Sequence, residues 1–178
     1  MAEKYPEITE KLQSFIEQQN LFFVATADSD GRINLSPKGG DTLRVAGKNR
    51  ILWLNLTGSG NETAAHMRAV NRITLMFCSF ERQPMILRVY GSGTVVHERD
   101  DAWPDLVKLF PANTGARQVF DIEVEMVQTS CGYQVPYFEH KGERDTLDKW
   151  SEKKGRDGVR EYWLEKNTLS LDGKPTGI

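Results

Sequence analysis

Cysteine and histidine are scarce in this chain, which has two cysteines and three histidines among 178 residues. Cys78 and Cys131 form no CxxC pair and no Cys/His cluster of metal-ligand spacing, so we interpret both as reduced structural thiols. We expect Cys131 to be buried in a tight turn; a reactive thiol is the alternative if it is exposed near a cation. His66, His97 and His140 show no HxxxH or HExxH pattern. We therefore expect structural or surface histidines, no metal site and no histidine-based nucleophilic catalysis.

Long apolar runs and an excess of one charge are also missing. No segment approaches the roughly 18 apolar residues of a membrane-spanning helix, and the opening MAEKYPEITEKL lacks the apolar core of a signal peptide. The 23 basic and 25 acidic residues give a net charge of −2, so no overall field attracts nucleic acid or anionic lipid. We therefore expect a cytoplasmic protein that binds neither membranes nor nucleic acid.

The chain does have a series of short β-rich runs separated by tight turns. The runs at 21–27 and 32–37 flank the sequence DSDG, which is typical of a hairpin turn. Pro37 is expected to end the second strand, with a turn at 38–41. The run at 51–56 is apolar enough to be covered on both faces. The remaining expected strands are 42–47, 72–80, 85–96 and 119–130.

Helices are expected around these strands. Their expected positions are 7–19, 62–70, 101–110 and a two-helix extension from residue 142 onward. The short helix at 62–70 would have Ser59 or Asn61 as its N-cap. Gly91 and Gly93 indicate a bulge or bend inside the strand at 85–96.

Short antiparallel strands at close spacing, with one short helix inserted after the fourth, favour a small β-barrel. No βαβ alternation is present, which argues against a parallel sheet. The predicted fold class is therefore mainly β with peripheral helices. We divide the chain into a barrel domain with its N-terminal helix, residues 1–136, and a C-terminal helical extension and tail, residues 137–178.

Two segments of this barrel have the chemistry to hold a phosphate. Residues 58–63, GSGNET, bring hydroxyls, an amide and free backbone N–H groups to the start of a helix. Residues 36–40, SPKGG, place a lysine and two glycines at the end of a nearby strand. Each segment alone is as consistent with an ordinary turn, but we expect the fold to bring the two together. Arg32 and Arg88 are alternative cations, and Trp53 is expected in the core.

The motifs RINLSPK, ILWLNL, GSGNETAAHM, NRITLMF and LRVYGSG follow one another within residues 20–97. In this order and spacing they resemble the flavin-binding core of the pyridoxamine 5'-phosphate oxidase-like family. SCGYQVP (130–136), GER (142–144) and SLDGKPTG (170–177) are similar to the signature of one subgroup of that family. The resemblance implies a split β-barrel that forms a homodimer, with one FMN at each of two sites in the subunit interface.

The resemblance also implies which residues would bind the flavin. Arg32, Asn34, Ser36 and Lys38 match the strand beside the flavin and its phosphate, Leu54 and Asn55 match the strand whose backbone borders the isoalloxazine ring, and Ser59, Asn61 and Thr63 match the phosphate loop. The catalytic residues stay unknown, because in such proteins the cofactor carries the redox chemistry.

This sequence departs from the vitamin B6 enzyme of the family at two places. Asn61 and Glu62 stand where that enzyme has consecutive basic residues, and SLDGKPTG lacks the arginine and histidine of its C-terminal segment. Pyridoxamine phosphate oxidation is therefore not expected, and Lys38 or an arginine must offset the phosphate charge. We expect an FMN-dependent oxidoreductase of a small-molecule substrate, with NAD(P)H as a candidate electron donor. The alternatives are a non-catalytic flavin-binding storage or sensor protein, and a barrel that binds deazaflavin or haem.

Overall fold

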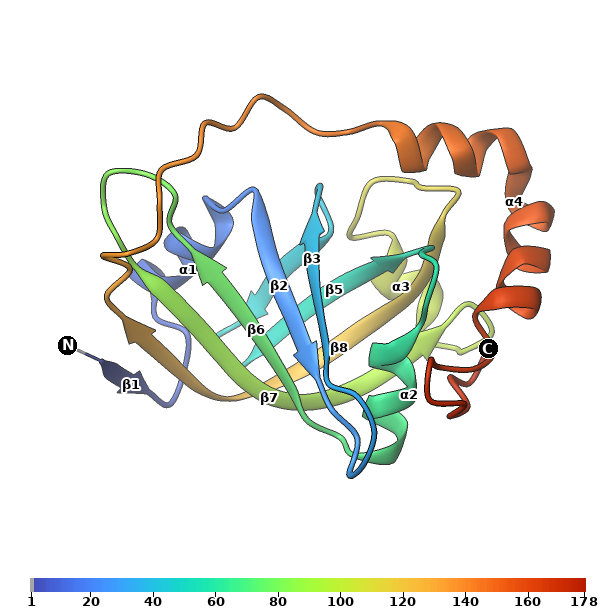
Figure 1. The fold of residues 1–178 in the computed structure, drawn as a ribbon, viewed down its shortest axis with the longest axis horizontal. Helices are drawn as coiled ribbons and strands as arrows, with labels where there is room; N and C mark the ends of the chain where they lie inside the picture. Colours follow the sequence, from blue (N-terminus) through green and yellow to red (C-terminus); the bar gives the residue numbers. More distant parts are fainter. Residues whose placement is uncertain (1) are drawn as a thin grey trace.

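A computed structural model of the chain describes residues 2–178 and shows one curled antiparallel sheet with helices around it (Figure 1). The strands are β1 (Glu3–Tyr5), β2 (Leu21–Thr26), β3 (Asn34–Gly39), β4 (Leu43–Gly47), β5 (Arg50–Leu56), β6 (Ile73–Cys78), β7 (Ile86–His97) and β8 (Ala116–Ser130). The helices are α1 (Glu10–Glu17), α2 (Glu62–Ala69), α3 (Trp103–Val107) and α4 (Thr146–Lys166). The predicted mainly β fold class with peripheral helices is confirmed.

The sheet curls because its two edge strands are consecutive in the chain. The hydrogen-bonded order is β3-β2-β6-β7-β8-β5-β4, with β1 added beside β8. Only residues 40–42 connect β3 to β4, so the two edges must meet at that end of the sheet. Gly40 takes a φ of 69° in this connection, a conformation that favours glycine. The result is a barrel that stays open between β3 and β4.

A bulge helps the long strand β7 to bend around this barrel. The register of β7 against β8 shifts between Tyr90 and Gly91. A Cβ atom at Gly91 would lie 2.1 Å from the carbonyl oxygen of Glu123, so only glycine fits there. The bulge predicted from the two glycines of this strand is confirmed.

The apolar core fills the barrel and is closed at one end by α1. Trp53 stacks on Phe120 with ring centroids 4.7 Å apart, and Phe22 stacks on Phe77 at 5.6 Å. Outside the barrel, a second apolar cluster joins β5 and β8 to α3. As predicted, β5 is buried on both faces and Trp53 belongs to the core.

Two local predictions are wrong, and one strand was missed. Pro37 does not end its strand: it pairs with Phe23, and β3 continues to Gly39, because β3 is an edge strand whose free side tolerates the missing N–H group. Strand β1 was not predicted, since three residues paired with the end of β8 leave little pattern in the sequence. Cys131 is exposed and not buried, because it follows the last residue of β8.

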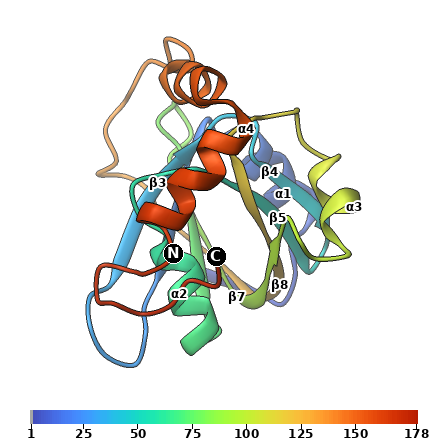
Figure 2. The same ribbon diagram turned by 90° about the vertical axis from the view of Figure 1, so that its right-hand side faces the viewer.

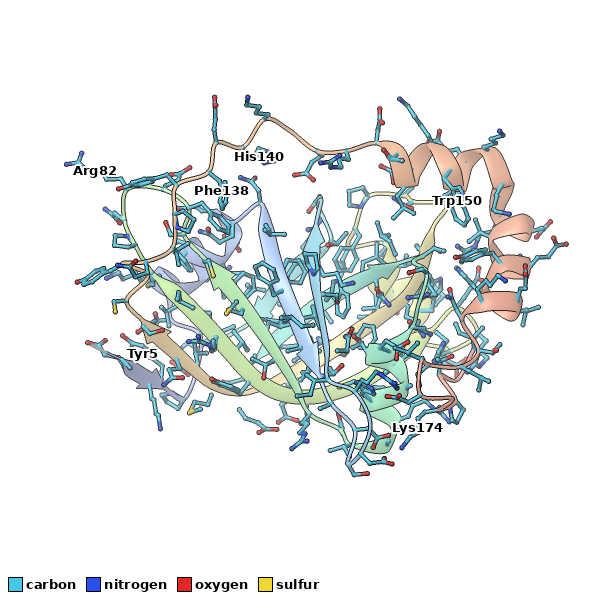
Figure 3. The ribbon with its side chains drawn as sticks, viewed as in Figure 1. Tyr5, Arg82, Phe138, His140, Trp150 and Lys174 are labelled. Carbon is cyan, nitrogen blue, oxygen red and sulfur yellow. The ribbon has the colours of Figure 1, made fainter. Side chains whose placement is uncertain are left out.

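The C-terminal part begins with residues 131–145, which run over the open side of the barrel to α4 (Figure 1). Phe138 and His140 lie on this segment (Figure 3), and the Phe138 ring packs against Phe80 at 5.3 Å. Helix α4 is broken at Gly155 (φ 68°, ψ 167°), so the predicted two-part helical extension is present. The domain boundary at residue 136 stays a prediction. Within residues 2–178, no helix combines the length and apolar character needed to cross a membrane.

Candidate functional site

The loop between β5 and α2, residues 57–61, is held firmly where it begins. Both the backbone N–H and the hydroxyl of Thr57 donate to the carbonyl of Gly115, each at 2.8 Å. The indole Nε1 of Trp163 in α4 then donates to the Thr57 hydroxyl at 2.8 Å. Since a hydroxyl can donate one hydrogen bond and accept others, Thr57 joins β8 and α4 to the loop through a single side chain.

The carbonyl oxygens of the loop are bonded to two buried side chains. Asn167 donates from Nδ2 to the carbonyls of Gly58 at 3.1 Å and Ser59 at 3.5 Å. Arg117 donates from Nη1 to the carbonyl of Gly60 at 3.1 Å and to Oδ1 of Asn167 at 2.5 Å. These contacts hold the carbonyl side of the loop against β8 and the end of α4.

The N–H groups of the same stretch are free. Within residues 2–178, the backbone N–H groups from 58 to 64 donate to no protein acceptor, and the first helical hydrogen bond of α2 runs from Ala65 to Asn61 at 3.3 Å. A helix N-terminus carries partial positive charge on such unpaired N–H groups. The stretch is therefore suited to accept an anion.

Asn61 strengthens this interpretation because its side chain is buried without a partner. It occupies the predicted N-cap position of α2 but makes no capping hydrogen bond, and it is only 2% exposed. Neither Oδ1 nor Nδ2 has a hydrogen-bond partner. Buried polar groups are nearly always paired, so an orphaned amide at a helix start indicates a site that a ligand would complete.

The structure brings β3 to the first turn of α2, as the sequence predicted. Asn34 donates from Nδ2 to the Thr63 hydroxyl at 3.2 Å and to the Thr26 hydroxyl at 3.5 Å. Ser36 and Lys38 follow on the same half-buried side of β3, since alternate residues of a strand share a face. The contact between β3 and the segment 58–63 is therefore made by Asn34, and the segment 36–40 begins two residues further along the strand.

Lys38 is a half-buried cation that forms no ion pair with a carboxylate within residues 2–178. Its Nζ lies 5.3 Å from the centroid of the Trp53 ring. Burial lowers the pKa of Lys38 from 10.5 to about 8, and the positive charge of Arg117 acts in the same direction. Desolvation disfavours the charged form of an amine, which explains the sign of the change.

Arg117 is the site residue that sequence reasoning missed. It is 3% exposed, its Nε has no hydrogen-bond partner, and within residues 2–178 it forms no ion pair. Burial lowers its pKa to about 10. The sequence offered little signal, because Arg117 stands at the start of a strand in which charged and apolar residues alternate.

The remaining predicted site residues are distributed as follows. Arg32 is exposed and forms an ion pair with Asp172 of the C-terminal tail, while Ser59 is exposed on the loop. Leu54 is buried under α3, and its neighbour Asn55 donates to Oε1 of Gln118 at 3.2 Å. The Nε2 atom of Gln118 has no partner, so it adds a third buried polar side chain with unmet hydrogen bonds.

Arg88 and the three histidines are accounted for by other contacts. Arg88, the alternative cation, donates to the Ser130 hydroxyl at 3.1 Å. His66 is buried with its ring 3.1 Å from the Thr26 hydroxyl. His97 is buried, and burial followed by the charge of Arg99 lowers its pKa. His140 lies 3.6 Å from Glu143 at the surface, so the predicted structural and surface roles of the histidines agree with their positions.

Comparison with known proteins supports the fold and the family. A family model described as pyridoxamine 5'-phosphate oxidase matches residues 8–131. A curated protein of Aspergillus flavus, pyridoxamine 5'-phosphate oxidase family protein ustO, is 34% identical over 189 residues, which cover 96% of this chain and 76% of that protein.

Two solved structures are similar in fold. A single-site variant of HupZ from Group A Streptococcus is 21% identical, with a TM-score of 0.56, and the match covers 69% of this chain and 99% of that one. A candidate pyridoxamine 5'-phosphate oxidase of Lactobacillus delbrueckii is 22% identical, with the same TM-score of 0.56 and coverages of 69% and 94%. At this level of identity the comparison shows the split-barrel fold alone.

The lowered pKa of Lys38 predicts an unusual pH dependence of stability. Between pH 8 and 10.5 the unfolded chain keeps a proton on Lys38 that the folded chain has lost, so the free energy of unfolding should rise with pH in that window. Below pH 8, Lys38 is charged in both states, and the full cost of burying this charge lowers the free energy of unfolding. Lys38→Met should therefore stabilise the protein at pH 7 by about 1 to 3 kcal/mol and give no gain near pH 10.5.

Urea unfolding of both proteins from pH 7 to 10.5 measures this difference. Lys11→Met, which removes an exposed lysine of α1, is the matched control and should leave the curve unchanged. A Lys38→Met protein that is less stable than the parent at pH 7 would contradict the prediction.

Proposed function

Because this chain belongs to the pyridoxamine 5'-phosphate oxidase family, matching its family model over residues 8–131 and a family protein over 96% of its length, we propose that it binds FMN. We propose further that it is a flavin-dependent oxidoreductase acting on a small molecule. The observation that carries this proposal is the run of free N–H groups at the start of α2, together with the half-buried Lys38 and the buried Arg117, which have no anionic partner within residues 2–178.

The residues present fit the phosphate end of FMN. A phosphate monoester carries close to two negative charges at neutral pH and three strong acceptor oxygens. The loop offers unpaired N–H donors and the orphaned amide of Asn61, while Lys38 and Arg117 supply positive charge from the protein interior. Arg32 keeps donors beyond its contact with Asp172, because a guanidinium has five N–H groups.

When bound, FMN would supply hydride and electron transfer. The residues of the chain would bind and orient it. Asn34, Ser36 and Lys38 would line its β3 side, and Leu54 and Asn55 would border the ring. The aromatic pair of Trp53 and Phe120 excludes water from the barrel on the inner side of Lys38.

Oxidation of pyridoxamine 5'-phosphate itself is not part of this proposal. Glu62 stands where the vitamin B6 enzyme has a basic residue, and its carboxylate accepts the backbone N–H of Leu171 with both oxygens at 3.0 Å. A carboxylate engaged in this way contributes negative charge near the loop. We therefore propose a substrate other than pyridoxamine 5'-phosphate, with NADH or NADPH as the electron donor.

Homodimerisation is supported by the outer face of β3. Ile33 is 78% exposed and Leu35 63% exposed, and Pro37 lies on the same side of this edge strand. Apolar side chains in a row on a soluble protein mark an interaction surface. We propose that a second copy of the chain covers this face, which places β3 at the subunit interface.

The proposed function predicts a yellow protein with flavin absorption bands. Purified protein saturated with FMN should be reduced by NADH or NADPH in a stopped-flow experiment that follows the flavin absorbance, and the reduced form should be reoxidised by the substrate. Absence of reduction by either nucleotide would favour a storage or sensor protein. A Soret band would identify haem, and a protein that ignores FMN and deazaflavin would refute the proposal.

Lys38→Met should weaken FMN binding although it stabilises the free protein. Loss of a charge-assisted contact costs about 1.5 to 3 kcal/mol, which corresponds to roughly 10- to 100-fold in the dissociation constant. Quenching of FMN fluorescence measures this change, with Lys11→Met as the control. An unchanged dissociation constant would assign the charge compensation to Arg117 alone.

Leu35→Glu should convert the dimer to a monomer, because it places a charge in the centre of the proposed apolar interface. Light scattering after size-exclusion chromatography measures the mass of the variant. Leu164→Glu changes an exposed leucine of α4, away from β3, and should leave the dimer intact. A monomeric parent protein, or a Leu35→Glu protein that stays dimeric, would show that this face is not the interface.

A further inference from the structure

The C-terminal segment 168–178, which we call the C-terminal clasp, is tied to the end of α4 and folds back on itself. Leu169 pairs with Pro175, and the N–H of Ser170 donates to the carbonyl of Lys174 at 2.8 Å. The hydroxyl of Thr176 donates to the carbonyl of Asn167 at 2.6 Å. Figure 2 shows this segment beside α2, whose first turn belongs to the proposed phosphate site, and beside the loop that joins β2 to β3.

On one side, the clasp is bonded to the tip of the β2–β3 hairpin. Lys174, at the lower right of Figure 3, forms ion pairs with Asp28 at 2.9 Å and with Asp30 at 2.5 Å. Asp172 accepts the backbone N–H of Arg32 at 2.7 Å. Gly31 permits this approach, because a Cβ there would lie 2.6 Å from the Asp172 carboxylate. The clasp therefore fixes the start of the strand that carries Asn34 and Lys38.

On the other side, the clasp and the residue before it are bonded to the loop at 58–62. Leu171 donates its backbone N–H to Glu62, in the first turn of α2. Asn167, fully buried, donates to the carbonyls of Gly58 and Ser59 and accepts from Arg117. One continuous stretch of chain thus connects the loop of the proposed phosphate site to the hairpin that leads into β3.

The bonds to the carbonyls determine where the loop N–H groups point. In a trans peptide the C=O of one residue and the N–H of the next point in opposite directions, and no peptide bond in residues 2–178 is cis. The carbonyls of Gly58, Ser59 and Gly60 all face Asn167 and Arg117. The N–H groups of the three following residues, 59 to 61, must therefore point away from those side chains, toward the side where they meet no protein acceptor.

We infer that Asn167 is a positioning residue that, together with Arg117 and the C-terminal clasp, aims three consecutive backbone N–H groups at the phosphate of the bound flavin. This inference rests on the proposed function. Successive N–H groups pointing into one space form an anion-binding concavity, and it is stronger when the backbone is fixed before the ligand arrives. Asn167 itself touches only the back of the loop and does not contact the phosphate.

The test compares FMN with riboflavin, which has the same ring and no phosphate. Asn167→Ala should raise the dissociation constant of FMN about tenfold, because several N–H groups lose their fixed direction, and should leave that of riboflavin unchanged. Asn49→Ala is the matched control. Asn49 also donates from Nδ2 to two carbonyls, those of Pro6 at 2.9 Å and Val124 at 3.0 Å, but it lies in the turn between β4 and β5. This control should lower stability without changing the ratio of the FMN dissociation constant to the riboflavin dissociation constant.

The outcomes separate this inference from the proposed function. A parent protein that binds neither FMN nor riboflavin refutes the proposed function. If the parent prefers FMN and the Asn167→Ala protein keeps the full preference, the role of Asn167 is refuted while the proposed function stands. If Asn167→Ala does not fold, Thr176→Val replaces it, since it removes only the hydroxyl that bonds to the Asn167 carbonyl. This variant should also lower the preference for FMN over riboflavin, but by a smaller factor. An unchanged ratio in that variant would equally overturn the inference.

Discussion

Positive charge that is buried without a negative partner is the constraint on which the site depends. Taking a single charge out of water costs several kcal/mol unless an opposite charge or a set of hydrogen bonds replaces the lost hydration. Lys38 and Arg117 receive little of this compensation, and the lowered pKa of each reflects the cost. A dianionic phosphate at the start of α2 would offset both charges, so binding and folding should be strongly linked.

Along β5 and β8, the paired side chains that point into the barrel change from apolar to polar. The proposed ligand site begins at this change. Ile51 and Trp53 of β5 face Ile122 and Phe120 of β8 in the core. The next inward pair along the two strands is Asn55 and Gln118, which bond to each other and leave one amide nitrogen unpaired. The end packed by α1 is apolar, while the opposite end, next to α2 and α4, keeps unmet hydrogen bonds that a ligand could complete.

Sequence reasoning recovered the parts of this arrangement that depend on neighbours in the chain: the curled sheet, the bulge of β7 and the helix start at GSGNET. The meeting of β3 with α2 followed from the motif order, which resembles a family whose barrel joins them. Pro37 was misread because its effect depends on whether a strand lies at a sheet edge. Arg117 was missed because its partners Gly60 and Asn167 are 57 and 50 positions away. A strand arginine is usually exposed, and the packing of α4 and its tail over the start of β8 buries this one.

These long-range contacts give a physical reason why the loop can do without the basic pair of the vitamin B6 enzyme. A cation in place of Glu62 would act directly on a phosphate, but it would leave Leu171 without its carboxylate partner, 109 positions away, and the C-terminal clasp without one attachment. Glu62 instead attaches the clasp, Asn167 and Arg117 hold the loop carbonyls, and the N–H groups are left as the donors. The charge that the loop itself lacks is supplied from the interior by Arg117 and Lys38. In the proposed site, oriented backbone N–H groups and the positive charges of Arg117 and Lys38 would therefore take the place of basic side chains in the loop, and the C-terminal residues that bond to the loop would be required for this arrangement.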